Sequence, residues 1–63
     1  MDEKLIEERV RQVMALDQNA FDIYTDLAKF APTGKMKETL LALAIDESRH
    51  VQSEKAILKL ILP

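Results

Sequence analysis

One short stretch decides the fold: Ala31-Pro32-Thr33-Gly34, which contains the only glycine of the chain and the only proline before residue 63. Proline lacks a backbone N–H and disfavours helical backbone in the residue before it, so a helix arriving from the N-terminal side must end here. Thr33 is a residue type that caps helix N-termini, so a second helix is expected to begin directly after it. The stretch therefore predicts two helices joined by a tight turn.

Apolar residues on both sides of this turn recur at the spacing of an α-helix. From Leu5 onwards they lie three or four residues apart, with charged residues between them, and no helix-breaking residue interrupts either half. A short connection between two long helices folds them antiparallel. We therefore expect one all-α domain over residues 1–63, with a helix over about 3–30, a turn over about 31–34 and a helix over about 35–62.

The chain is too short to complete a stable core by itself. It has 63 residues, and a domain of this size buries only about 60% of its unfolded surface. Such a domain needs disulfides, a structural metal or oligomerisation, and the absence of cysteine leaves the last two. Residues 56–62 are apolar nearly all round the helix, which favours self-association over contact with a membrane surface. We expect a homodimer, or a higher homo-oligomer, that completes a four-helix bundle.

The charge balance and hydropathy argue against several classes of function. Nine Lys and Arg against eleven Asp and Glu give a net charge of -2, so no basic patch is offered to nucleic acid. No apolar run approaches the roughly 20 residues of a membrane span, and residues 1–4 lack the pattern of a signal peptide, which predicts a cytoplasmic protein. Without cysteine the chain has no redox motif of its own, so redox chemistry would need an external electron donor.

Three polar residues lie on helical faces that are otherwise apolar. Glu47 and His50 are three residues apart, a spacing that points a carboxylate and an imidazole toward a shared cation. Asp17 lies among the apolar residues of the first helix. In an antiparallel hairpin that turns about Pro32, residues whose numbers sum to about 64 lie at equal height, so Asp17 should face Glu47. A two-fold axis at this level would bring two copies of each residue together, as in a di-metal site.

Two further residues are candidates near this group. Tyr24 lies two helical turns after Asp17, where its phenol could hydrogen-bond a ligating carboxylate, donate one electron, or simply pack in the core. Glu54 follows His50 by four residues and Glu47 by seven, so it is either an additional carboxylate ligand or a solvated residue of the helix. The sequence alone leaves these alternatives open.

The chain resembles the ferritin-like and rubrerythrin-like superfamily in its single-hairpin form, similar to the encapsulated ferritins, and the pattern that carries the resemblance is Asp17-x6-Tyr24 followed by Glu47-x2-His50. The resemblance implies that Asp17, Glu47 and His50 are metal ligands. It also implies that Tyr24 lies beside the centre and that two hairpins dimerise to complete a di-iron site. The family generally has glutamate where this chain has Asp17, whose shorter reach favours terminal over bridging ligation. No segment resembles the docking peptide that would direct the chain into a protein compartment.

The ligand set of carboxylates and imidazoles suits iron or manganese, with zinc as a frequent occupant, and we expect iron. The function that follows is oxidation of Fe(II), or reduction of peroxide or oxygen, at a di-iron centre, as in an oxidoreductase of the ferroxidase or peroxidase type. Two alternatives stay open. One is a structural or storage metal site that ties the dimer together, and the other is a metal-free helical oligomerisation module.

Overall fold

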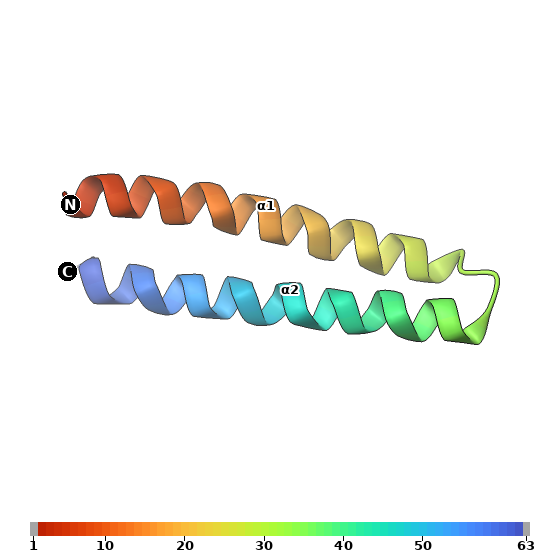
Figure 1. Ribbon diagram of the computed structural model, residues 1–63. Helices are drawn as coiled ribbons and strands as arrows, with labels where there is room; N and C mark the ends of the chain where they lie inside the picture. The colour runs from red at the N-terminus through yellow and green to blue at the C-terminus, as the bar shows by residue number, and fades with distance from the viewer. Residues whose placement is uncertain (1, 63) are drawn as a thin grey trace.

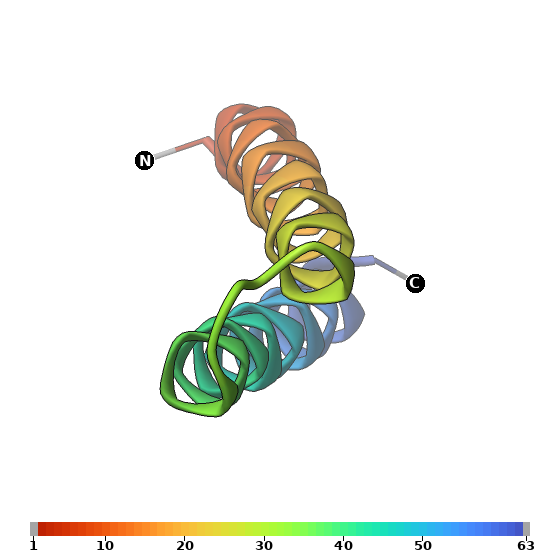
Figure 2. The same cartoon turned by 90° about the vertical axis from the view of Figure 1, so that its right-hand side faces the viewer.

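The computed structural model describes residues 2–62, which form two α-helices, α1 (Glu3–Lys29) and α2 (Gly34–Ile61). The helices run antiparallel and side by side, so the start of α1 and the end of α2 lie at the same end of the rod (Figure 1). Viewed along the rod, the two helices cross at an angle (Figure 2). The predicted all-α antiparallel hairpin is confirmed, and its turn occupies residues 30–33, one residue earlier than expected.

Both helices begin at a residue whose side chain caps the first turn. The Asp2 carboxylate accepts a hydrogen bond from the backbone N–H of Lys4 at 3.0 Å. The Thr33 hydroxyl oxygen accepts one from the backbone N–H of Met36 at 3.1 Å. These caps satisfy N–H groups that have no partner within the helix. The predicted capping role of Thr33 is confirmed, because its hydroxyl secures the start of α2 directly after Pro32.

The core between the two helices is thin. Among residues 2–62, four residues are buried in the hairpin and all four are apolar: Ala28, Ala44, Val51 and Leu58. Two of these are alanines, which remove little apolar surface from water and therefore contribute little hydrophobic stabilisation. The remaining residues of the seam between α1 and α2 are only partly covered. One hairpin thus leaves most of its apolar surface without a partner.

The hairpin is long and thin for its mass. Its Cα radius of gyration is 14.6 Å, where a compact domain of 63 residues would have about 11 Å. Its accessible surface is 4889 Å², where a folded monomer of 7.2 kDa exposes about 4,100 Å². The difference of about 800 Å² equals the area that one partner contributes to a protein–protein interface of ordinary size.

Many of the exposed apolar side chains belong to one face of the hairpin, which we call the open face. It consists of two rows of residues spaced seven apart, one row on each helix: Val13, Ala20, Leu27, Met36, Leu43, His50 and Ile57. A two-fold axis perpendicular to the plane of the two helices relates one antiparallel helix to the other. Rows that have the same position relative to the seam therefore lie on the same face of the hairpin. Five of these residues are large and apolar, and they are 39% to 49% exposed. The equivalent rows on the opposite face contain one exposed large apolar residue, Leu41, among polar residues such as Arg11, Gln18 and Lys55.

The open face continues round α1 through a further row of apolar residues. This row consists of Leu16, Ile23 and Phe30, of which Phe30 is 82% exposed. Contiguous apolar surface of this kind marks an interaction site. The exposed apolar side chains and the elongated shape together suggest an oligomerisation surface. Within residues 2–62, neither helix contains a stretch that is both long enough and apolar enough to cross a membrane.

Candidate metal centre

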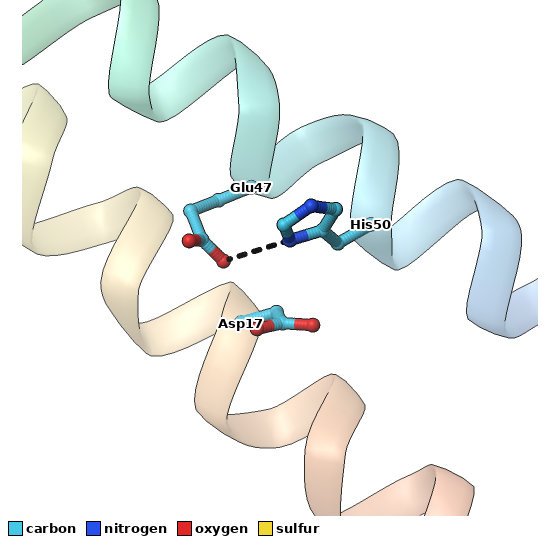
Figure 3. A group of neighbouring side chains, drawn as sticks. All are labelled: Asp17, Glu47 and His50. Carbon is cyan, nitrogen blue, oxygen red and sulfur yellow. Dashed lines mark ion pairs between the residues drawn. The ribbon is translucent and has the colours of Figure 1, made fainter.

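The structure brings three of the predicted ligands together near the middle of the hairpin. Asp17 lies on α1, beside Glu47 and His50 on α2 (Figure 3). Each residue contributes one ligand atom to the group, and these atoms all lie within 4.8 Å of one another. The predicted match in height between Asp17 and Glu47 is therefore confirmed. The group can hold a metal ion.

Glu47 and His50 differ in their exposure. The Glu47 side chain is 19% exposed and points into the seam, whereas the His50 side chain is 59% exposed on the open face. Oε2 of Glu47 lies 3.7 Å from Nδ1 of His50, which is too far for a hydrogen bond. This oxygen is buried and has no hydrogen-bond partner among residues 2–62. His50 forms an ion pair with this oxygen only when its imidazole is protonated (Figure 3). Beside a neutral His50, a cation held with Asp17 would satisfy the buried oxygen, so the site fits a metal ion.

Glu54 is a fourth acidic residue in the same part of the seam. It is partly buried, and its Oε1 has no exposed surface and no hydrogen-bond partner within the described chain. Burial, a hydrogen bond with Asp17 and the negative charges of Asp17 and Glu47 together raise the pKa of Glu54 from its ordinary value of 4.5 to about 7. The charge of His50 acts in the opposite direction, toward a lower pKa. Glu54 is thus partly withdrawn from solvent, and its role as an additional carboxylate ligand stays a prediction.

This raised pKa predicts that the metal-free protein loses stability as the pH rises from 4.5 to about 7. Folded Glu54 holds its proton more tightly than unfolded Glu54, so the stabilisation is fully present below this window and is lost through it. Glu54→Gln mimics the protonated form, so it should remove this part of the pH dependence and be the more stable protein above about pH 7. Thermal unfolding followed by circular dichroism in EDTA measures the effect. An unchanged pH dependence in the variant, relative to the exposed control Glu38→Gln, would contradict it.

Tyr24 lies on the seam side of α1, two helical turns after Asp17, and it is partly buried. Its phenol makes no hydrogen bond within residues 2–62. The position is suited both to packing between the helices and to contact with a ligating carboxylate. The role of Tyr24 beside the centre therefore stays a prediction.

The group formed by Asp17, Glu47 and His50 resembles one half of a metal-binding shell. Its ligands come from two helices only, and residues 2–62 enclose no pocket around them. His50 belongs to the open face, so the group borders the surface that lacks a partner. Additional ligands can approach from that side. The site thus combines the donor atoms of a metal centre with the location of an interface.

Comparison with protein-family models, with curated proteins and with solved structures finds no match to this chain. The hairpin, its open face and its carboxylate–histidine group are the features on which a functional proposal can be built.

Proposed function

We propose that two copies of this chain pack open face against open face into a four-helix bundle, where their metal-binding groups meet as a di-iron centre. The observation that carries the proposal is the position of Asp17, Glu47 and His50, which lie together near mid-height beside the open face. The proposed activity is oxidation of Fe(II), or reduction of peroxide or oxygen with an external electron donor. The resemblance of the ligand pattern to the ferritin-like superfamily supports the same function.

A second copy of the chain suits the open face as a partner. The hairpin exposes about 800 Å² more than a compact monomer of its mass, which matches one side of an ordinary interface. The open face is apolar at every position except His50, so it would bury well against an identical face. A two-fold axis near the level of the centre would also supply the ligands that one hairpin lacks.

The proposed dimer would bring four carboxylates and two imidazoles to two metal ions, supplied twice over by Asp17, Glu47 and His50. This donor set suits iron or manganese, and zinc also binds such sites. Two bound Fe(II) ions would supply two electrons, which together with two protons reduce one hydrogen peroxide to two waters. The part of the protein is to hold the ions at a fixed separation, to balance their charge with carboxylates and to limit the access of water.

Elemental analysis of the purified protein tests metal binding directly. We expect about one iron per chain, as a di-iron bundle of two hairpins requires, and loss of that iron when Glu47 and His50 are both changed to alanine. The matched control changes Asp46 and Arg49 to alanine. These residues form an exposed ion pair of 3.9 Å with the same i,i+3 spacing on the same helix. Circular dichroism and sedimentation of each protein establish that it remains helical and show its oligomeric state.

Two other results would select the alternatives. Bound zinc that shows no redox activity, together with stability that falls on adding a chelator, would indicate a structural metal site. The thin core of the hairpin is the observation that favours this second candidate. No specific metal, even after anaerobic loading with Fe(II), would indicate a metal-free oligomerisation module and would refute the di-iron centre.

A further inference from the structure

We infer that Glu54 belongs to the metal centre as an additional carboxylate, and that it makes the centre keep Fe(III) after oxidation. This inference rests on the proposed function. It assigns iron the role of a resident cofactor, which remains bound through turnover, instead of a substrate that passes through the site.

The geometry joins Glu54 to the centre through Asp17. Glu47 and Glu54 are seven residues apart, so they lie on the same side of α2, about 10 Å apart along the helix axis. Asp17 on α1 connects them, because it has a ligand atom within 4.8 Å of one on Glu47 and its carboxylate interacts with Glu54, whose pKa it raises. Asp17 therefore links the two carboxylates of α2 across the seam.

Two oxygen atoms in this group are poorly satisfied without a cation. Oε2 of Glu47 and Oε1 of Glu54 are the buried side-chain oxygens that have no hydrogen-bond partner among residues 2–62. Both oxygens belong to residues of α2 that interact with Asp17 on α1. His50, four residues before Glu54, adds an imidazole to the same group. A cation near Asp17 would thus attract Glu54 as well as the three predicted ligands.

The charge of Glu54 determines whether the carboxylates of the dimer match the positive charge of two Fe(II) ions or of two Fe(III) ions. Asp17 and Glu47 from two chains supply four negative charges, which equal the charge of two Fe(II) ions. Adding Glu54 from each chain gives six, which equal the charge of two Fe(III) ions. Because an uncompensated charge in a partly buried site is unfavourable, the group with Glu54 favours retention of the oxidised pair.

Retention of iron after oxidation tests this inference without relying on activity. The dimer is loaded anaerobically with Fe(II), oxidised with hydrogen peroxide and passed through a desalting column with a ferric chelator, and the retained iron is measured by elemental analysis. Wild type should keep its iron. Relative to the Fe(II) that each protein initially binds, Glu54→Gln should release Fe(III) to the chelator about tenfold faster or more than wild type. Glu38→Gln, an exposed change of the same kind on the same helix, should behave as wild type.

The outcomes separate this inference from the proposed function. Equal retention of Fe(III) by Glu54→Gln and wild type would overturn the role of Glu54 while leaving the di-iron centre intact. Failure of wild type to bind Fe(II) would overturn the proposed function, and this inference with it. If Glu54→Gln is not a folded dimer, Glu54→Asp provides the test, because it keeps the charge with a shorter reach. Its retention should lie below that of wild type, and retention equal to wild type would count against direct ligation.

Discussion

A Leu43→Lys protein is expected to be a monomer that no longer holds iron. Leu43 lies one helical turn before Glu47 on the open face, where it is 39% exposed in the single hairpin. In the proposed dimer it would be covered by the second copy, and two-fold symmetry would introduce the lysine twice. Burying these charges without partners costs several kcal/mol, so the dissociation constant of the dimer should rise by about a thousandfold or more. Sedimentation over a range of protein concentrations measures this shift.

Ile45→Lys is the matched control for this experiment. Ile45 is 53% exposed, more than Leu43, but it lies outside the open face. The same substitution at this position should therefore leave both the dimer and its iron in place. A Leu43→Lys protein that remained a dimer with bound iron would show that the copies associate through another surface, and the proposed assembly would have to be abandoned.

Asp17→Asn is expected to slow Fe(II) oxidation by about a hundredfold or more. Asparagine keeps the shape of the side chain but removes the negative charge, so the proposed di-iron centre loses two of its four carboxylates, one from α1 of each chain. Changes to residues that only orient the ligands of a metal already cost about 10- to 100-fold, and loss of a ligand should cost at least as much. Stopped-flow absorbance of the Fe(III) product, after mixing Fe(II)-loaded protein with peroxide, gives the rate.

Asp22→Asn provides the comparison on the same helix. The Asp22 carboxylate is exposed and accepts a hydrogen bond from Nε2 of Gln18 at 3.2 Å, so its change should leave the oxidation rate near that of wild type. Asp17→Glu, which restores the usual residue of the ferritin-like pattern, should retain the activity. If Asp17→Asn oxidised Fe(II) as fast as wild type, the redox role of the centre would be refuted, even if metal still bound.

The sequence was sufficient to predict the hairpin and the height at which its polar residues meet. Pro32 and Thr33 act at neighbouring positions, one ending a helix and the other capping the next, so local chemistry alone locates the turn. Once the turn is known, antiparallel geometry matches Asp17 with Glu47 because both helices rise by the same amount per residue. These inferences needed no information about side-chain packing.

The division of each apolar stripe between seam and open face could not be predicted in the same way. Met14 is partly covered by the partner helix, whereas its neighbour Val13 is 45% exposed, although both fit the helical spacing. Spacing defines a wide stripe but not which part of it the second helix covers, which depends on the rotation of each helix about its axis. For the same reason, helical spacing alone does not decide whether Glu54 faces the seam or the solvent. The seven-residue spacing from Glu47 favours the seam, because residues two helical turns apart lie on the same side of a helix.

The single short turn between α1 and α2 also determines how the hairpin can open. In this antiparallel hairpin, residues that lie beside one another are placed almost symmetrically about the turn at residues 30–33. The chain segment between two such residues therefore becomes longer toward the end that holds both termini. Local unfolding should therefore begin at the end that holds both termini and proceed toward the turn. Asp17 and Glu47 lie near the middle of α1 and α2, beyond the reach of fraying in the terminal turns. The candidate ligands are thereby separated from the local unfolding expected at the ends of so slender a molecule.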